Sequence, residues 1–171
     1  MLTPHESLTR AIVFQQLNGK AAETILGRFL ALFDSNGFPA PSQILAKPVE
    51  DLRAAGLSRG KSAYIRNIAE YCVSGTMPSL AECEMMSDAQ IIETLTVIKG
   101  VGRWTAEMFL IFNLGRPDVL PIHDFGVRKG YQIAFHKRTM PTPKALERYG
   151  RRWAPYRSLA AWYLWRATDS K

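Results

Sequence analysis

The chain has little of what marks secreted, membrane-spanning or metal-clustered proteins. Its 171 residues include only two cysteines, Cys72 and Cys83. Two are too few for a disulfide framework or for a four-cysteine zinc or iron–sulfur site. No apolar run approaches the roughly 20 residues that span a bilayer, and the N-terminal MLTPHESLTR lacks the apolar core of a secretory signal. These absences favour a reducing, intracellular setting away from membranes.

Acidic residues are scarce in the last part of the chain. Lys and Arg number 22 against 15 Asp and Glu, which gives a formal net charge of +7. Residues 1–98 carry a net charge of −2, whereas residues 99–171 carry +9. A basic segment of this kind is typical of a surface that binds a polyanion, most often nucleic acid. A solubilising excess of charge would give the same composition.

Strand patterns are also lacking, because apolar residues recur at helical spacing nearly throughout, as in residues 22–33. Capping boxes at T-P-H-E (3–6) and S-D-A-Q (87–90) begin helices, and glycines end them. With 47% apolar residues and no flexible linker, the chain is predicted to be all-α, in one domain spanning 1–171. The expected helices cover roughly residues 4–17, 21–34, 41–46, 48–54, 59–74, 88–96, 102–114, 124–136, 143–149 and 155–168.

A glycine-rich turn, I-K-G-V-G-R at 98–103, separates two of these helices. Glycines two apart permit a tight hairpin whose exposed amides, at a helix start, favour an anion such as a DNA phosphate. Lys99 and Arg103 add positive charge, and Thr105 adds a hydroxyl. The segment therefore predicts a helix–hairpin–helix, over about 88–114, that holds the DNA backbone. An ordinary helix corner whose glycines serve packing is the alternative.

One carboxylate, Asp124, follows Gly102 by 22 residues, in the segment H-D-F-G-V-R-K. The prolines before it exclude a helix there, so we expect Asp124 to begin the next helix. A helix N-terminus favours the charged form of a carboxylate. Gly126, in the first turn of that helix, indicates a close backbone approach, and a glycine that is tolerated there without a structural purpose is the alternative. A plain N-cap would explain Asp124 taken alone.

Five segments in this order resemble the helix–hairpin–helix base-excision DNA glycosylase superfamily, in particular its 3-methyladenine DNA glycosylase II branch. The hairpin I-K-G-V-G-R-W-T-A and the helix start H-D-F-G-V-R-K match two family motifs. R-A-I-V-F-Q-Q-L-N-G-K-A-A, L-S-R-G-K-S-A-Y-I and W-A-P-Y-R-S-L-A-A-W-Y-L-W match three more. The resemblance covers nearly the whole chain. It implies the minimal helical core of that fold, with two interleaved helical subdomains and no extra N-terminal domain.

The resemblance also implies roles for individual residues. Asp124 aligns with the catalytic aspartate, and Gln16, with Leu17 beside it, aligns with the residue that wedges into the DNA stack. Residues of the base pocket would be Trp104, Trp165, Met108 and Gln15. Residues that contact DNA phosphates would be Lys99, Gly100, Val101, Gly102, Arg103, Thr105 and Lys61. A monovalent cation, Na⁺ or K⁺, would be held by the main-chain carbonyls of Thr96, Ile98 and Val101. Lys20, Arg59 and Lys61 lie in loops that match the DNA-facing surface, where solvated charge is the alternative for each.

The activity implied is excision of alkylated purines of the 3-methyladenine and 7-methylguanine type from double-stranded DNA. The base is rotated out of the helix, the indole faces attract its positive charge, and Asp124 stabilises the electron-poor sugar and orients water until an abasic site remains. Trp104 stands where lyase-active members carry a lysine, so no lyase activity is expected. No cofactor is required for this chemistry, and no iron–sulfur cluster is expected.

Other functions remain open at this point. Met108 stands where one branch has a pocket tyrosine, so the lesion could instead be uracil, a deaminated purine or a mismatched base. A non-catalytic helix–hairpin–helix DNA-binding protein and a structural helical adaptor are further alternatives, and neither needs Asp124. The expected partner is double-stranded DNA containing damaged bases. The protein would meet it as a monomer, in the cytoplasm at the nucleoid or in a eukaryotic nucleus.

The remaining tryptophans and histidines have plainer expected places. Trp153 and Trp162 are expected in the core, where most tryptophans of all-α proteins lie. His5 and His136 are expected in solvent. His123, next to Asp124, is a weaker candidate for catalysis or for a phosphate contact.

Overall fold

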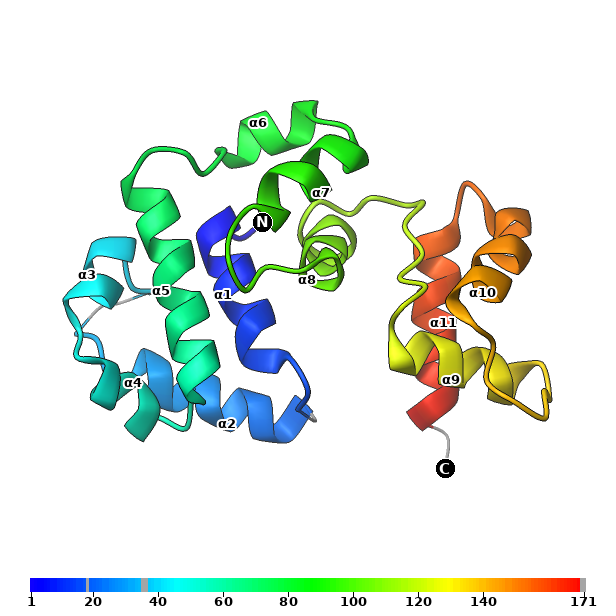
Figure 1. The fold of residues 1–171 in the computed structure, drawn as a ribbon, viewed down its shortest axis with the longest axis horizontal. Coiled ribbons are helices and arrows are strands. Elements are labelled where there is room, and N and C mark those ends of the chain that lie inside the picture. Colours follow the sequence, from blue (N-terminus) through cyan, green and yellow to red (C-terminus); the bar gives the residue numbers. More distant parts are fainter. Residues whose placement is uncertain (18, 35–36, 170–171) are drawn as a thin grey trace. The chain divides into compact units, whose positions relative to one another are not determined.

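The computed structural model describes residues 1–17, 19–34 and 37–169, and every regular element in these ranges is helical (Figure 1). The predicted all-α class is confirmed. No helix in the described ranges is both long enough and apolar enough to cross a membrane. The α-helices are α1 (Pro4–Phe14), α2 (Gly19–Leu30), α3 (Pro41–Ala46), α4 (Val49–Ala54), α5 (Arg59–Val73), α6 (Leu80–Met85), α7 (Asp88–Thr96), α8 (Arg103–Met108), α9 (Phe125–Ala134), α10 (Pro143–Gly150) and α11 (Arg157–Asp169).

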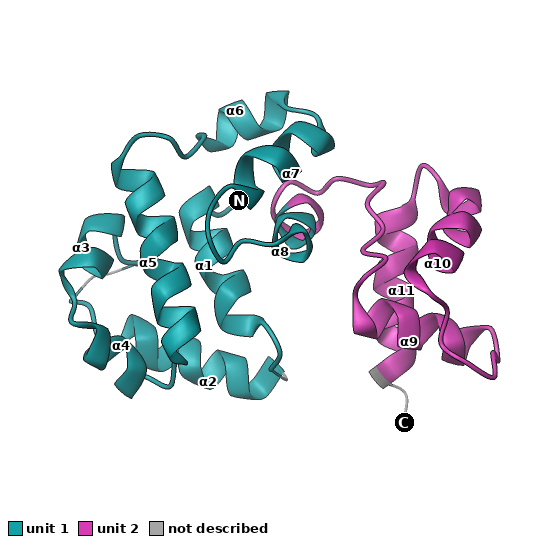
Figure 2. Cartoon of the chain, in the orientation of Figure 1, with its two compact units in different colours: residues 1–109 teal, residues 110–171 magenta. Residues whose placement is uncertain are grey.

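The chain divides at a single point into two compact units, unit 1 with residues 1–109 and unit 2 with residues 110–171 (Figure 2). The two subdomains expected to interleave are therefore consecutive. The reason is that α8 packs on α1 and α7, which precede it, while the later helices α9 and α11 pack on each other. Each unit is described by itself below.

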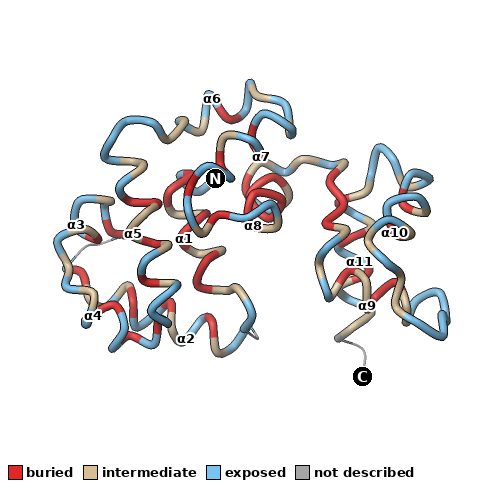
Figure 3. The backbone as a smooth tube through the Cα atoms, viewed as in Figure 1, coloured by how far each residue is buried: buried red, intermediate tan, exposed pale blue. Residues whose placement is uncertain are grey.

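Unit 1 is organised around α5, which packs against α1, α3 and α4. Buried positions recur at helical intervals along α1 and α5 (Figure 3). Leu8 and Ile12 of α1 and Ile65 and Ile68 of α5 are each 0% exposed. Removing a side chain of this size from water contributes about 1.5–3 kcal/mol. Helices α1 and α5, which pack on each other, thus each bury an apolar side.

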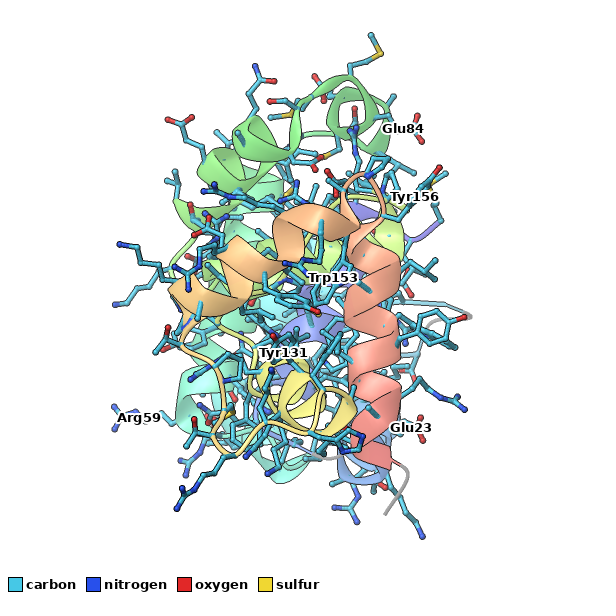
Figure 4. The ribbon with its side chains drawn as sticks, turned by 90° about the vertical axis from the view of Figure 1, so that its right-hand side faces the viewer. Glu23, Arg59, Glu84, Tyr131, Trp153 and Tyr156 are labelled. Carbon is cyan, nitrogen blue, oxygen red and sulfur yellow. The ribbon has the colours of Figure 1, made fainter. Side chains whose placement is uncertain are left out.

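Unit 2 is held together by a close approach of α9 and α11. A Cβ atom built on Gly130 of α9 would lie 1.8 Å from the carbonyl oxygen of Leu164 in α11. The two helices therefore nearly touch backbone to backbone, which only glycine permits. Tyr131 and Trp153 lie in the space enclosed by α9, α10 and α11 (Figure 4), with ring centroids 6.4 Å apart. Trp153 packs on the core as expected.

Several expected boundaries were wrong. The helix expected at 4–17 ends at Phe14, because Gln16 has a left-handed backbone with φ of 56°. The helix expected at 102–114 is α8 followed by a π-helical turn, Phe109–Asn113. Helix α6 was not predicted, although it carries a capping box. Ser79 N donates to Glu82 Oε2 at 2.7 Å, and Glu82 N donates to Ser79 Oγ at 3.3 Å.

Candidate active site

The predicted hairpin lies in unit 1, between α7 and α8. Helix α7 begins with the expected capping box and ends at Thr96, and the turn after it closes through a hydrogen bond from Val101 N to Ile98 O at 2.9 Å. Gly100 has φ of 103°, a conformation that side chains other than glycine rarely adopt. Gly102 is the N-cap of α8 and is exposed. The local glycine signals thus predicted both the turn and the new helix.

Two side chains of helix α5 contact this turn. A Cβ atom on Gly100 would lie 2.1 Å from Cγ of Tyr64, so the tyrosine ring packs directly against the glycine backbone. Asn67 Nδ2 donates to the carbonyl oxygen of Lys99 at 2.9 Å. The main chain of the hairpin is therefore fixed by two side chains, three residues apart, on one face of α5.

The residues predicted to contact phosphates differ in their exposure to solvent. Lys99, Gly102 and Arg103 are exposed, and Arg103 Nε also donates to Glu107 Oε1 at 2.9 Å. Thr105 is buried, and its hydroxyl accepts a hydrogen bond from Gln15 Nε2 at 3.0 Å. What Thr105 can offer a phosphate is the main-chain amide of the first helical turn, where amides lack an intrahelical acceptor.

Lys61 has contacts that its motif did not predict. Its Nζ donates to the carbonyl oxygens of Val13 at 2.7 Å and of Gln15 at 2.8 Å, at the C-terminal end of α1. Burial lowers the pKa of the Lys61 ammonium below its ordinary value. The residues expected to wedge into DNA, Gln16 and Leu17, follow directly and are exposed.

Asp124 is the N-cap of α9 in unit 2, as predicted. Its Oδ1 accepts hydrogen bonds from Val127 N at 2.7 Å and from Trp165 Nε1 at 2.8 Å. Two N–H donors on one oxygen fix the direction of the carboxylate. The structure thus brings together Asp124 and Trp165, two predicted site residues 41 positions apart.

The indole of Trp165 reaches Asp124 because of Gly126. A Cβ atom there would lie 2.8 Å from Trp165 Cδ1 and 3.2 Å from Asp124 Oδ1. The sequence predicted a close backbone approach at this glycine, and the groups that lie close to it are side chains. Phe112, which is 64% exposed, stacks on Trp165 with ring centroids 5.7 Å apart. Two further predicted pocket residues, Trp104 and Met108, lie on α8 and belong to unit 1.

The comparisons with known proteins agree with this geometry. Residues 9–155 match the family model of the HhH-GPD superfamily base excision DNA repair proteins. The chain belongs to this superfamily. It is 42% identical over 165 residues to DNA-3-methyladenine glycosylase 1 of Schizosaccharomyces pombe, covering 96% of this chain and 72% of that protein. It is 26% identical over 168 residues to DNA-3-methyladenine glycosylase 2 of Escherichia coli, covering 94% of this chain and 56% of that protein.

Two solved structures have the same fold as this chain. The S. pombe 3-methyladenine DNA glycosylase Mag1, in complex with abasic DNA, matches with a TM-score of 0.93 and 41% identity, over 98% of this chain and 81% of that one. An 8-oxoguanine glycosylase/lyase of Clostridium acetobutylicum matches with a TM-score of 0.78 at 18% identity, over 97% of this chain and 60% of that one, which shows the fold alone. The predicted superfamily and its alkylpurine branch are thus confirmed.

The monovalent cation implied by the superfamily resemblance would lie at the end of α7 and in the hairpin turn. Main-chain carbonyl oxygens, the donors that Thr96, Ile98 and Val101 offer, suit Na⁺ and K⁺. The Ile98 oxygen already accepts the Val101 amide, and a carbonyl oxygen has a second lone pair. The donor set therefore fits such a cation, and the site stays a prediction. Within the described ranges, no group of three or more His, Cys, Asp or Glu could hold a metal ion.

Some expected places were wrong, and some residues were missed. His5 is only 8% exposed because α1 turns it into the core of unit 1, and Trp162 is 44% exposed because it lies on the outer side of α11. Lys20, Arg59 and His123 are exposed, and Arg59 extends away from the ribbon in Figure 4. Tyr64 lies within the motif L-S-R-G-K-S-A-Y-I, and its spacing from Lys61 was the available signal for its role. Asn67 had no such signal.

Proposed function

We propose that the protein is a monofunctional DNA glycosylase of base excision repair, which extrudes alkylated purines from double-stranded DNA and hydrolyses their bond to the sugar. The observation that carries this proposal is the Asp124 carboxylate, held on one oxygen by an indole and a main-chain amide. Relatives named as 3-methyladenine glycosylases support the class of lesion. The similar structure in complex with abasic DNA supports double-stranded DNA as the partner and an abasic site as the product.

Asp124 is suited to stabilise positive charge on the deoxyribose. As the glycosidic bond lengthens, the sugar becomes an oxocarbenium ion, and a fixed carboxylate beside it lowers the barrier electrostatically. The same carboxylate orients and deprotonates the attacking water. An alkylated purine leaves as a neutral base and needs little help from an acid. One carboxylate is therefore enough where sugar hydrolases use two.

The lesion would be recognised by aromatic faces. An alkylated purine carries a positive charge, which an indole face attracts by about 0.5–2 kcal/mol. Trp165 is already placed against Asp124 and backed by Phe112. Trp104, Met108 and Gln15 of unit 1 stay predicted contacts of the base from the superfamily resemblance. Trp104 also explains the absence of lyase activity, because an indole has no amine to form a Schiff base with the sugar.

Unit 1 would hold the DNA strand. The exposed hairpin at 98–103 offers main-chain amides and the charges of Lys99 and Arg103 to the phosphates. A Na⁺ or K⁺ bound at its carbonyl oxygens would add positive charge at the same turn. Gln16 and Leu17, which are exposed, would fill the gap that the extruded base leaves. The protein would act as a monomer wherever the genome lies, at the nucleoid or in a nucleus.

The decisive experiment compares the wild-type protein with Asp124→Asn on duplex oligonucleotides that each carry one defined lesion. Asparagine is also a good N-cap, so α9 should keep its start while the negative charge is lost. We expect release of free 3-methyladenine or 7-methylguanine to fall at least about 100-fold, with DNA binding retained. Alkali-sensitive sites in the strand measure the abasic site, which is the other product of the same reaction.

The matched control is Glu147→Gln, which removes an exposed carboxylate from α10 of the same unit. It should release bases like the wild type. Equal release by Asp124→Asn and wild type would remove Asp124 from the mechanism. Release of uracil or a deaminated base in preference to alkylpurines would replace the substrate class. Binding without release of any base would favour the non-catalytic alternative.

A further inference from the structure

The turn that follows α1 is held in an unusual conformation. This inserting turn, residues 15–17, includes Gln16 with φ of 56°, in the left-handed region. Such a conformation in a residue other than glycine persists only where the surroundings fix it. Among the described residues, the main chain beyond the helix end supplies one hydrogen bond to this turn, from Leu17 N to Phe14 O at 3.3 Å. Other groups must therefore stabilise it.

Two side chains from other helices do so. Lys61 of α5 donates to the carbonyl oxygens of Val13 and Gln15 at 2.7 and 2.8 Å. Carbonyls at a helix C-terminus lack intrahelical donors, and a cation there also suits the helix dipole. On the other side, Gln15 Nε2 donates to the hydroxyl of Thr105 in α8 at 3.0 Å. The inserting turn is thus tied to both α5 and α8.

The adjoining surface of α5 holds the hairpin. Lys61, Tyr64 and Asn67 are spaced three residues apart, so each side chain lies beside the next on the helix surface, and the three together span about 120° around the helix axis. Tyr64 packs on Gly100, and Asn67 donates to Lys99 O. Helix α5 has 15 residues and a fully buried inner side, which makes it a stiff support. All of these residues lie in unit 1.

We propose that Lys61 is a positioning residue for base extrusion, which holds the inserting turn in its DNA-ready form and, through α5, at a fixed distance from the hairpin. This inference rests on the proposed glycosylase function, because it concerns the step before bond cleavage. It replaces the phosphate contact that the motif predicts for Lys61. The ammonium donates two of its three N–H groups to these carbonyl oxygens, so at most one is left for a phosphate.

Removal of the Lys61 ammonium should weaken base extrusion and leave the binding of undamaged DNA unchanged. Without the ammonium, the end of α1 would have to be ordered each time a base is extruded, and the cost of ordering would lower the extruded fraction. Binding of undamaged DNA, which the hairpin and the basic residues supply, would remain. A lesion that is already unstacked, such as one in a bulge, would need less insertion and would be affected less.

The test compares Lys61→Met, which keeps the alkyl stem, with Lys61→Arg, which keeps donors for both carbonyls. Arg53→Met, an exposed cation on α4, is the control for loss of charge in unit 1. Extrusion is followed by fluorescence of 2-aminopurine beside the lesion, and cleavage by single-turnover base release at saturating enzyme. We expect Lys61→Met to lower both by roughly tenfold to 100-fold in paired duplex, and less in a bulge. Lys61→Arg should largely restore them, and Arg53→Met should match the wild type.

The salt dependence of binding separates positioning from phosphate contact. Under the proposal, binding of undamaged duplex and its salt slope are unchanged in Lys61→Met. Weaker binding with a slope reduced by about one, and normal extrusion at saturation, would make Lys61 a phosphate contact and overturn the proposal. Extrusion equal to that of the wild type would overturn it as well.

Two further measurements keep the test decisive. If Lys61→Met does not fold, as judged by thermal unfolding, Thr105→Val replaces it in the test. This substitution removes the hydrogen bond between Gln15 and Thr105, and it should lower extrusion without weakening the binding of undamaged DNA. In a Gln16→Ala background, Lys61→Met should add little, and a full additional loss would contradict action through the turn. Fluorescence reports extrusion without cleavage, so absence of base release in the wild type would count against the proposed function and not against this inference.

Discussion

The two units hold their proposed DNA-facing groups in opposite ways. In unit 1, side chains of α5 and α8 fix main-chain turns, at residues 15–17 and 98–102. In unit 2, a main-chain amide and an indole fix one side chain, the Asp124 carboxylate. Their charges also differ, since residues 1–109 carry a formal net charge of −1 and residues 110–171 carry +8.

This difference assigns separate tasks to the two units. A turn held through its backbone keeps its shape when its own side chains change, provided that the supporting helix stays in place. A carboxylate held by an indole from another helix depends on the distance between the two helices. Unit 1 should therefore be sensitive to changes in α5, and unit 2 to changes in the packing of α9 on α11.

The largest expected effect comes from Gly130→Ala in unit 2. The added Cβ would lie 1.8 Å from Leu164 O and 2.5 Å from Leu164 C, both backbone atoms that cannot rotate away. The helices must separate, and Trp165, one residue beyond Leu164, should move from Asp124. We expect a loss of about 3 kcal/mol or more in the free energy of unfolding, together with loss of base release. Urea denaturation followed by tryptophan fluorescence measures the first.

The same substitution in unit 1 should have the opposite sign. Gly27 lies inside α2, is exposed, and would meet nothing within 4 Å of an added Cβ. Gly27→Ala should therefore stabilise by up to about 1 kcal/mol through helix propensity. A mild effect of Gly130→Ala would show that the helices of unit 2 adjust freely, and the contrast between the units would be lost.

The next effect concerns a buried histidine of unit 1. His5 is 8% exposed, and its Nε2 has no hydrogen-bond partner among the residues that the structure describes. Burial lowers its pKa to about 4 from 6.5. Between these values the unfolded chain binds a proton that the folded chain does not, so stability falls as the pH falls. The contribution lost between pH 6.5 and 4 is at most about 3 kcal/mol.

His5→Leu should flatten this part of the pH dependence of the free energy of unfolding. The exposed His136 provides the control, and His136→Asn keeps a residue that tolerates its φ of 50°. Because several carboxylates also titrate in this range, the quantity to compare is the difference between variant and wild type. An unchanged difference from pH 7 to 4 would mean that His5 is reached by water in the folded state.

Sequence reasoning succeeded where the signal was local. The Gly100 turn and the Asp124 N-cap each depend on residues within about four positions, and both were predicted. The Ser79–Glu82 capping box was equally readable, and α6 could have been predicted from it. The motif predicted that Lys61 contacts a phosphate or solvent. Its carbonyl partners lie 46 and 48 residues away, and no local pattern specifies such a contact. The burial of His5 likewise depends on how α1 packs in unit 1.

The smallest expected effect comes from an ion pair of unit 2, between Asp118 and Arg157 at the start of α11. Arg157 Nε lies 2.6 Å from Asp118 Oδ1, Nη2 lies 2.8 Å from Oδ2, and these hydrogen bonds hold the pKa of Asp118 below its ordinary 3.8. Both side chains are about one-third exposed, so Asp118→Asn should cost only about 1 kcal/mol at pH 7. Because the folded pKa is lowered, this difference should vanish as the pH falls through it. A loss as large as that of Gly130→Ala would mean that ion pairing, and not helix contact, positions α11 beside Asp124.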